Sequence, residues 1–343
     1  MSESLHFQEK LVAILKQSIA DNVSLAAELS DLLNISMDSV YRRLRCQSTF
    51  SFDEVGLIAE RFSISLDGLF RKEDNQVNFN FNPMYGQPFN FSKYLEWYAT
   101  YLSDLARIPE TSVIYAAEDI PVIRHFKYPH LSAFKAYYWS KAVLNIEVFH
   151  SKQFDFSEVS QKLIDNNLKT AEAYSKLNVT EIWSEETITS TLRQIRFYFD
   201  CHFFDNHETA LIVLSDLRKM FEHMEIECQE NDLETRQRQG DFKLYISDLM
   251  IGNNCVYIEP GKQHAPERVF IGHNTFNTIS TSDPKFLTET RHWINNLIRK
   301  SILLTGSAEK QRVIFFKKMY DKISSLENYI KQQSEELMET ESI

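Results

Sequence analysis

The sequence predicts a multidomain, mostly α-helical protein, with an N-terminal five-helix bundle that contains a helix-turn-helix and a larger α+β domain with a small antiparallel sheet. Three observations lead to this prediction. The 343 residues exceed the length of one typical domain. Apolar residues recur at helical spacing in the first seventy residues and in most of the remainder. After Asp241, short apolar or alternating runs are separated by turn residues, which is typical of antiparallel strands.

The first two helices of the bundle are predicted by apolar stripes at helical spacing. These stripes consist of Leu11, Ile14, Leu15 and Ile19, and of Leu25, Leu29, Leu32 and Leu33. The second helix starts near Ser24 and ends before Asn34, a residue type that tolerates the left-handed backbone of a helix-ending turn. Ser36 is then a good N-cap for a third helix over residues 37–45.

Two further helices close the bundle. Ser51, with Glu54 three residues later, predicts a capping box at the start of the fourth helix. The apolar face of this helix holds Val55, Ile58, Ala59 and Phe62. A last short helix is expected over residues 66–70, so the bundle occupies residues 1–72.

Composition favours an ordered protein of a reducing compartment. Hydrophobic residues make up 43% of the chain and aromatic residues 13%, which allows a substantial core and excludes a disordered protein. The first residues lack a basic segment followed by an apolar one, and no run of about 18 apolar residues follows. The four cysteines form no C-x-x-C pair. We therefore expect a soluble, cytoplasmic protein without a membrane partner.

A resemblance to a known family supports the interpretation of the bundle. Two helices joined by a short turn, with a basic second helix, are what a helix-turn-helix requires. The segment LSDLLNISMDSVYRRLRCQSTFSFDEVGLIAERFSISLDGLF, residues 29–70, resembles the lambda-repressor and Cro type of helix-turn-helix domain. The matching positions are Leu29, Leu33, Ile35, Ser36, Ser39, Val40 and Ser65 to Asp67. The departures are Ser30 in place of alanine, Asn34 and Cys46 in place of glycine, and Arg43 in place of an apolar residue.

The resemblance implies that the third helix binds double-stranded DNA, with contact residues Ser36, Met37, Asp38, Ser39, Tyr41, Arg42, Arg43 and Arg45. If Val40 and Leu44 face the core, helical geometry places Arg42 nearly opposite them. Arg42 is therefore expected to read guanine O6 and N7, the commonest specific contact of an arginine. Arg43 and Arg45 are expected to hold phosphates, which position the domain without reading sequence.

Two other residues of this helix have expected roles. Ser36, together with the helix N-terminus, can hold a phosphate. Asp38 can accept a hydrogen bond from cytosine N4. The expected function is that of a sequence-specific, DNA-binding transcription regulator. The alternative is a protein-interaction scaffold whose helix-turn-helix no longer binds DNA.

The charge distribution bears on this choice. The whole chain holds 37 Lys and Arg against 48 Asp and Glu, which counts mildly against nucleic-acid binding. Residues 1–72, however, hold 8 basic against 10 acidic residues, so most of the negative charge lies downstream. Residues 73–92 are expected to form a linker with an edge strand, because Asn alternates with Phe79 and Phe81 there. Residues 93–343 are expected to form a helix-rich α+β effector domain that provides the homodimer contacts and binds an unidentified small-molecule effector.

Motifs for catalysis or metal binding are weak. Asp200, His202, Asp205, His207 and Glu208 lie close in sequence, but no pair of histidines has the i, i+4 spacing of a zinc helix. A helix corner with Asp205 or Asn206 as N-cap is the preferred interpretation. The S-x-x-K motif at residues 307–310 lacks its partner motifs, and no phosphate-binding loop is present. We expect no enzymatic activity, no cofactor and no metal.

Two apolar stripes in the second domain leave alternatives open. The first consists of Tyr94, Leu95, Trp97, Tyr98, Tyr101, Leu102 and Leu105, and favours core packing or a ligand pocket over base stacking, because no basic residues interleave it. The second consists of Phe316, Met319, Ile323, Leu326 and Ile330 in the last helix. It spans two heptads, so packing on its own domain and contact with a second copy are about equally expected.

Overall fold

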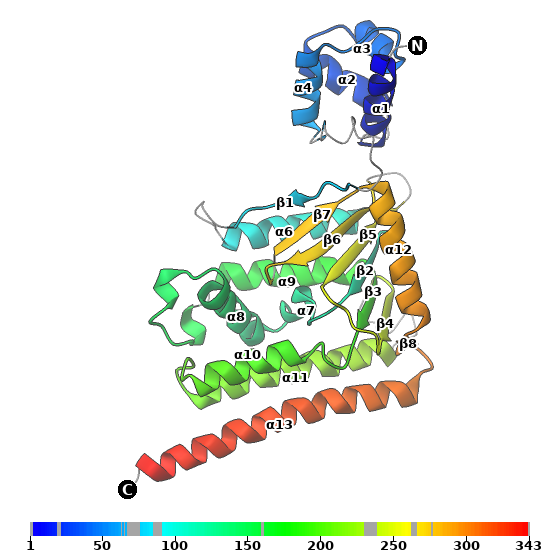
Figure 1. Cartoon of the computed structure of the whole chain (residues 1–343). Coiled ribbons are helices and arrows are strands. Elements are labelled where there is room, and N and C mark those ends of the chain that lie inside the picture. The colour runs from blue at the N-terminus through cyan, green and yellow to red at the C-terminus, as the bar shows by residue number, and fades with distance from the viewer. Residues whose placement is uncertain are drawn as a thin grey trace.

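A computed structural model of the chain describes residues 3–18, 22–62, 64, 66, 76–84, 91–158, 161–229, 239–261, 266–275 and 277–341. Within these ranges the protein is mostly helical, with a helical bundle at the N-terminus and a larger part that contains a sheet (Figure 1). The multidomain, mostly helical class predicted from the sequence is confirmed.

The N-terminal bundle consists of α1 (Glu3–Ser18), α2 (Asn22–Leu33), α3 (Met37–Leu44) and α4 (Phe52–Arg61). The stripes predicted from the sequence meet in one core, in which Leu11, Leu15, Leu25, Leu29, Val40 and Ile58 are fully buried. The capping box between Ser51 and Glu54 is present at the start of α4, as predicted. The expected fifth helix, over residues 66–70, lies outside the described residues except for Leu66.

The sheet of the second domain is mixed, whereas the sequence predicted a small antiparallel one. It consists of β1 (Asn80–Phe81), β2 (Ser112–Ala116), β3 (Asn178–Trp183), β4 (Phe242–Ile246), β5 (Cys255–Glu259), β6 (Arg268–His273), β7 (Asn277–Thr281) and β8 (Ile302–Leu303). The strand order is β1-β7-β6-β5-β2-β3-β4-β8. Strands β2, β3 and β4 are parallel, and the other neighbours are antiparallel.

The helices between β2, β3 and β4 explain this difference. Each helical connection returns the chain to the end of the sheet where the previous strand began, so the next strand runs in the same direction. The predicted meander is confirmed for β5, β6 and β7, which pair antiparallel in chain order. Strand β4 has an alternating sequence like theirs, but it pairs in parallel with β3, with Val179 opposite Phe242.

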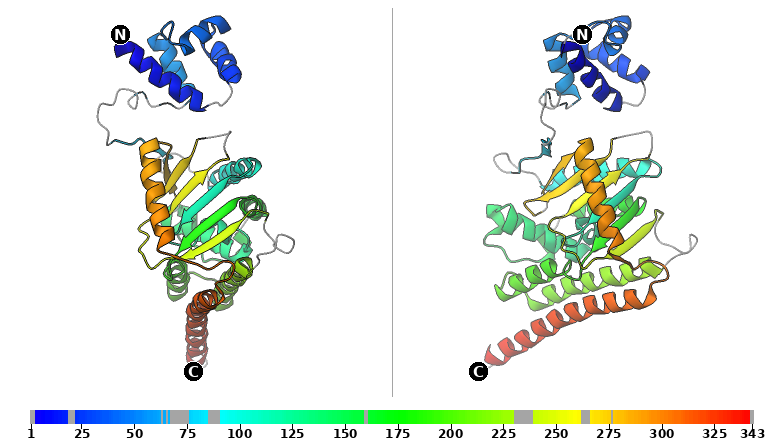
Figure 2. Two further views of the ribbon diagram at one scale, coloured as in Figure 1. Left: turned by 90° about the vertical axis from the view of Figure 1, so that its right-hand side faces the viewer. Right: turned by 45° about the vertical axis from the view of Figure 1, so that its right-hand side comes forward.

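Helices cover both faces of the sheet. The α-helices that the structure describes in this domain are α6 (Phe91–Arg107), α7 (Val122–His125), α8 (Pro129–Tyr138), α9 (Gln161–Ser175), α10 (Thr189–Asp200), α11 (His207–Gln229), α12 (Pro284–Arg299) and α13 (Glu309–Glu341), with a π-helical turn, Trp139–Val143, after α8. Helix α12 packs on one face, and α6 and α9 pack on the other (Figure 2). A separate core lies between α8, α10, α11 and α13.

The segment before α6 joins the sheet of the second domain. Strand β1 pairs antiparallel with β7 and stands at one end of the strand order. The ring of Phe79 meets Phe286 of α12 edge-on at 5.2 Å, and the ring of Phe81 meets His273 at 5.5 Å. The carbonyl of Asn82 accepts a hydrogen bond from the side chain of Asn277 at 2.9 Å.

The apolar stripe of the last helix packs on its own domain. Phe316, Met319, Ile323 and Ile330 are fully buried, and Leu326 is 7% exposed. All five belong to the core that α13 shares with α8, α10 and α11. This settles the alternative left open by the sequence, because a seam buried within its own chain does not remain available to a second copy.

Candidate nucleic-acid interface

The turn between α2 and α3 has the geometry of a helix-turn-helix. Asn34 adopts a left-handed backbone with a φ of 51°. The backbone N–H of Ile35 donates to the Ser30 carbonyl at 3.2 Å, and the Ser30 hydroxyl donates to the Ile35 carbonyl at 2.6 Å. Ser30, which stands where the lambda-repressor and Cro type has alanine, therefore adds a side-chain hydrogen bond across the turn. Ser36 caps α3, because its hydroxyl accepts from the N–H of Ser39 at 3.3 Å.

The other end of α3 closes in a Schellman motif. The N–H of Cys46 donates to the carbonyl of Arg43 at 2.9 Å, and the N–H of Gln47 donates to that of Arg42 at 2.8 Å. This motif needs a left-handed residue just past the cap, usually glycine. Cys46 takes that position with a φ of 56°. The exposed stretch of α3 is thus bounded by two turns that the backbone hydrogen bonds fix.

A buried side chain of α1 holds the end of α3 in place. Gln8 is 5% exposed, and its amide nitrogen donates to the carbonyls of Arg43 at 2.9 Å and Ser48 at 2.7 Å. Its amide oxygen accepts from the N–H of Phe50 at 3.1 Å. Gln8 was not among the residues predicted from the sequence. Its signal is a polar residue three positions before Leu11, on the core-facing stripe of α1.

The outer face of α3 carries two of the three arginines. Val40 and Leu44 are buried, as the helical wheel predicted. Arg42 is exposed, and its Nε lies 3.2 Å from the carboxylate of Asp38, with both side chains largely in solvent. Arg45 is exposed as well, and its guanidinium lies 5.9 Å from the ring centre of Tyr41.

The remaining predicted contact residues lie around these two arginines. Ser36 and Met37 are exposed at the start of α3, and Ser39 is partly buried. The structure thus brings the predicted residues onto one short helix. Their roles toward bases and phosphates remain predictions.

Arg43 differs from its two neighbours because it bonds within the bundle. Its Nη2 lies 3.0 Å from Oε1 of Glu54 in α4, and the two side chains are 20% and 16% exposed. Its guanidinium also lies 5.9 Å from the ring centre of Phe50. Glu54 uses its other oxygen to accept from the N–H of Ser51 at 2.7 Å. A phosphate contact by Arg43, as predicted from the sequence, would require this ion pair to open.

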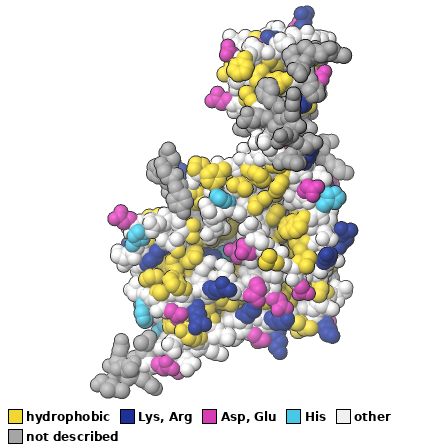
Figure 3. Space-filling model, in the orientation of Figure 1, with side chains coloured by type: hydrophobic (Ala, Val, Ile, Leu, Met, Phe, Trp, Pro, Cys, Tyr) yellow, Lys and Arg dark blue, Asp and Glu magenta, His cyan; other side chains and the backbone are white. Residues whose placement is uncertain are grey.

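Charge on the second domain is mixed. On the face shown in Figure 3, acidic and basic side chains of the described residues are interspersed over the lower half of this domain. Interspersed charges of both signs do not form the continuous basic surface that a DNA backbone attracts. On that face, the distribution does not compete with α3 as a DNA-binding surface.

The acidic and histidine residues around 200–208 form a helix corner. Asn206 caps α11, because its side-chain oxygen accepts from the N–H of Thr209 at 2.8 Å. The carboxylate of Asp200 accepts from the hydroxyl of Tyr329 at 3.0 Å. Within the described ranges, no group of three or more His, Cys, Asp or Glu residues is arranged to hold a metal ion.

The S-x-x-K motif lies at the start of α13. This helix begins at Glu309, so Ser307 stands before the N-cap position rather than in it.

Comparisons with known proteins bear on the N-terminal part of the chain. Searches of curated proteins and of solved structures found no match. None of the helices formed by the described residues has the length and apolar character needed to cross a bilayer. The family model of the BetR domain matches residues 2–87, which contain the four helices of the bundle and strand β1. The N-terminal part of the chain is thus similar to the BetR domain, a regulator domain of the helix-turn-helix type.

Proposed function

We propose that the chain is a sequence-specific, DNA-binding transcription regulator that contacts operator DNA through α3. The observation that carries the proposal is the helix α3 itself. It is fixed at both ends by the turn at Asn34 and the Schellman motif at Cys46, and it exposes Arg42 and Arg45 while it buries Val40 and Leu44. The BetR match over the same residues supports a regulatory role. The proposal includes no catalytic step.

The geometry suggests a division of roles on DNA. In the lambda-repressor type of docking, the N-terminal part of the second helix enters the major groove. Arg42 would then read a guanine, and Asp38, which already pairs with it, would hold its guanidinium or accept from cytosine N4. Arg45 and the N-terminus of α3 at Ser36 would contact phosphates. Arg43 would act indirectly, because its ion pair with Glu54 sets the position of α3 against α4.

The test uses the full-length chain and DNA selected from a random pool. Arg42→Ala is expected to cost about 1–3 kcal/mol on the selected site and little on random DNA. Arg45→Ala is expected to weaken binding to both DNAs alike and to lower the salt slope by about one unit. Arg107→Ala is the matched control, because Arg107 is an exposed arginine of α6 that also pairs with an aspartate.

The outcomes separate the proposal from the scaffold alternative. A selected motif whose binding falls steeply with salt would support a DNA-binding regulator. Equal losses on both DNAs for Arg42→Ala and Arg45→Ala would contradict base reading by α3. Unchanged binding for both variants, or recovery of no motif, would favour a protein-interaction scaffold.

We also propose that the second domain forms the dimer. Helix-turn-helix proteins usually bind two half-sites as two-fold dimers. Four aliphatic side chains near the β8 edge are 37–50% exposed: Ile302, Leu303, Val313 and Ile314. Light scattering is expected to give twice the chain mass, and the double variant Leu303→Asp, Ile314→Asp is expected to give one chain mass. A wild-type chain that is monomeric with and without DNA would contradict this.

A further inference from the structure

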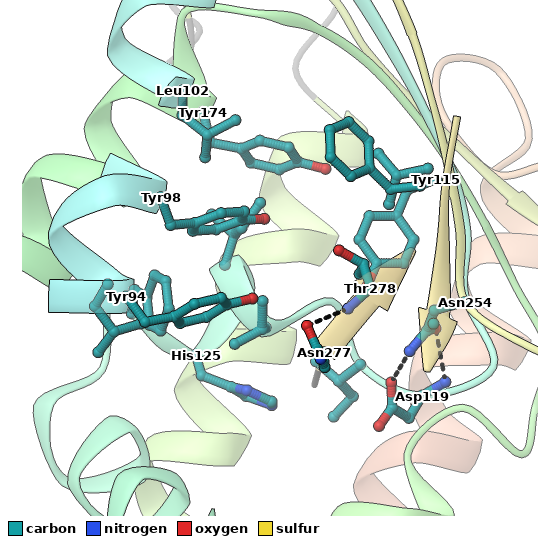
Figure 4. Close-up of a pocket in the computed structure, with 18 of the residues that line it drawn as sticks. Tyr94, Tyr98, Leu102, Tyr115, Asp119, His125, Tyr174, Asn254, Asn277 and Thr278 are labelled. Carbon is teal, nitrogen blue, oxygen red and sulfur yellow. Dashed lines mark hydrogen bonds between the residues drawn. The ribbon is translucent and has the colours of Figure 1, made fainter. Parts of the chain in front are cut away.

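A chamber lies between helix α6 and the sheet of the second domain. Its cavity volume is about 110 Å³, and Tyr94, Tyr98 and Leu102 of α6 form one wall. Strand residues, among them Tyr115 and Thr278, form the opposite wall (Figure 4). An apolar cavity of roughly 150 Å³ is large enough for benzene. The chamber is somewhat smaller than that cavity, so it has room for one ring and for no larger apolar group.

The aromatic walls make the chamber suited to a flat, apolar group. The stripe of α6 was predicted to form core or a ligand pocket, and its residues do both. Leu95, Leu102 and Leu105 are nearly fully buried, and Leu95 and Leu102 line the cavity together with Tyr94 and Tyr98. Burial raises the pKa of Tyr94 to about 12, so its hydroxyl is neutral. Neutral aromatic rings favour contact with another ring, edge-on or stacked.

His125, at the end of α7, gives the chamber an unsatisfied polar group. Its side chain is 1% exposed, and neither ring nitrogen has a hydrogen-bond partner among the described residues. Burial, and secondarily the charge of Lys135, lowers the pKa of His125 well below its usual value. The ring is therefore neutral, with one N–H donor and one acceptor. Leaving such groups unpaired is unfavourable, and a ligand of matching chemistry would offset that cost.

Lys135, from α8, places a positive charge at the same chamber. It is 3% exposed, and its Nζ donates to Gln194 Oε1 at 2.7 Å and to Thr191 Oγ1 at 3.2 Å. Both acceptors are neutral, so within the described ranges no carboxylate in contact balances the ammonium charge. The third N–H donor of the ammonium group is left for another acceptor. Burial lowers the pKa of Lys135 to about 8, so it is still mostly protonated at neutral pH.

The acidic residue of the chamber lies toward its mouth. Asp119 is partly exposed and lines both the chamber and an open polar groove. Its carboxylate is held by the side chain of Asn254, whose amide nitrogen donates to Oδ1 at 2.6 Å (Figure 4). The groove lies at the carboxyl ends of β2, β3 and β4, with Ser184 and Asp248 on its rim. Ligands of α/β sheets commonly enter there.

We propose that this chamber binds a small molecule that consists of one aromatic ring and one carboxylate. The ring packs between Tyr98 and the sheet, and the carboxylate accepts hydrogen bonds from Lys135 and His125. The ligand supplies the missing partner of a neutral buried imidazole, and it places a carboxylate in direct contact with a buried ammonium whose nearest acidic influence in the chamber is Asp119. As a sensor site, the chamber rests on the proposed regulatory function. Ligand binding is measured without DNA, so a failure here is distinguishable from a failure of DNA binding.

The experiment compares three probes that share one ring and differ in charge: benzoate, benzyl alcohol and phenyltrimethylammonium. Calorimetric titration of the full-length chain is expected to show benzoate binding about tenfold more tightly than benzyl alcohol, because a charged hydrogen bond contributes on the order of 1.4 kcal/mol. Phenyltrimethylammonium is expected not to bind, because it would face Lys135 without an acceptor. This series needs no variant and therefore does not depend on one that folds.

Variants then assign the recognition to residues. Lys135→Met keeps an unbranched side chain, shorter by one atom, and removes the charge, so it is expected to reduce the affinity for benzoate to near that for benzyl alcohol. His125→Leu is expected to weaken benzoate binding while it leaves thermal stability unchanged or higher, because it removes an unpaired polar group. Lys176→Met is the matched control, since Lys176, directly after α9, pairs with Glu172 outside the chamber.

Three results would overturn the proposal. Equal binding of benzoate and benzyl alcohol would show an apolar cavity without recognition of an acid. Tighter binding of phenyltrimethylammonium would show that the aromatic walls recognise a cation. Absence of binding for all three probes, with the chain folded, would show that the chamber is not a site for single-ring ligands.

Discussion

The N-terminal bundle and the second domain place their charged groups in opposite ways. In the bundle, Arg42 and Arg45 lie three residues apart on one short helix and face solvent. In the second domain, Arg124 is 8% exposed and pairs with Glu181, 57 residues away in sequence. Lys135 meets Gln194 across 59 residues. A charged site on the surface can thus consist of a few residues that are adjacent in sequence, whereas the residues of a buried charged site are distant in sequence and are brought together by the fold.

The same difference should appear in energies. An exposed pair such as Arg42 and Asp38 contributes little, because water and salt screen it and ordering the side chains costs entropy. The buried carboxylate of Glu181 is fully enclosed and accepts from Arg124 Nε at 2.9 Å, Tyr174 at 2.8 Å and the indole of Trp183 at 3.0 Å. Removing it leaves three buried donors short of an acceptor.

Glu181→Ala is therefore expected to cause the largest loss of stability, about 3–5 kcal/mol in the free energy of unfolding of the second domain. The measurement is denaturant unfolding followed by a signal from that domain. Asp38→Ala is the control from the bundle, and it is expected to change the unfolding free energy of its own domain by less than about 1 kcal/mol. Similar losses of unfolding free energy for Glu181→Ala and Asp38→Ala would show that buried and exposed ion pairs contribute equally in the two regions.

Lys135→Met tests the buried charge through its pH dependence. The pKa of Lys135 in the folded chain is about 8, below the value of about 10.4 for an unfolded lysine. Between these two values the unfolded chain binds more protons, so the wild-type gains stability as pH rises, by up to about 1.4 kcal/mol per pH unit. The stability of Lys135→Met relative to wild type should therefore fall from about pH 7.5 to about pH 9.5.

The difference in unfolding free energy between Lys135→Met and the wild type cancels the contributions of other titrating groups near the site. Asp119 and His125, which face Lys135 across the chamber, are present in both. Urea unfolding at the two pH values gives the difference directly. A difference that is independent of pH would mean that Lys135 titrates in the folded chain as it does in water.

The sequence predicted the features that depend on residues close together in the chain and missed those that depend on residues far apart. The turn at Asn34, the cap at Ser36 and the capping box at Ser51 were predicted because each depends on residues within three positions of one another. Strand β3 was not predicted, and neither was its parallel pairing with β2 and β4, because the neighbours that make residues 178–183 a strand are distant in sequence.

The candidate sites show the same limit. The exposure of Arg42 could be derived from the helical wheel, since it depends on α3 alone. The ion pair of Arg43 could not, because Glu54 lies eleven residues away in another helix. The aromatic wall of the chamber was predicted as core or a pocket from the spacing within α6. His125 and Lys135 were not selected, because they lie ten residues apart with no motif that links them, and each reaches the chamber only when α7 and α8 pack beside the sheet.

Arg43→Met tests an ion pair of intermediate burial within the bundle. The pair of Arg43 and Glu54 is neither as exposed as that of Arg42 and Asp38 nor as buried as that of Arg124 and Glu181. The substitution keeps the apolar part of the side chain and removes the guanidinium, which pairs with Glu54 and lies 5.9 Å from the ring centre of Phe50. We expect a loss of about 1–2 kcal/mol in the unfolding free energy of the bundle, as for a half-buried charged hydrogen bond. Arg42→Met should leave thermal stability nearly unchanged. If the two variants lost equal stability, the indirect role of Arg43 would be wrong.

The smallest effect is expected at the end of α3, and its sign is opposite to the others. Cys46 has a φ of 56°, where a side chain costs about 1 kcal/mol that glycine avoids. Cys46→Gly should therefore stabilise the bundle by about 0.5–1 kcal/mol. The loss of the packing contacts of the Cys46 sulfur reduces this gain only slightly, because the side chain is only partly buried.

Cys201 provides the matched control. It is also partly buried and follows a helix, but its φ of −89° is ordinary for a cysteine. Cys201→Gly should destabilise the second domain by about 0.5–1 kcal/mol, because glycine raises the conformational entropy of the unfolded chain and relieves no backbone strain in the folded one. Opposite signs for the two substitutions, measured by thermal unfolding, would show that the backbone at Cys46 is a strained point of the helix that carries the proposed DNA contacts. A loss of stability for Cys46→Gly as well would mean that the packing of the sulfur outweighs the strain, and that α3 is held by its side chains more than by its closing turn.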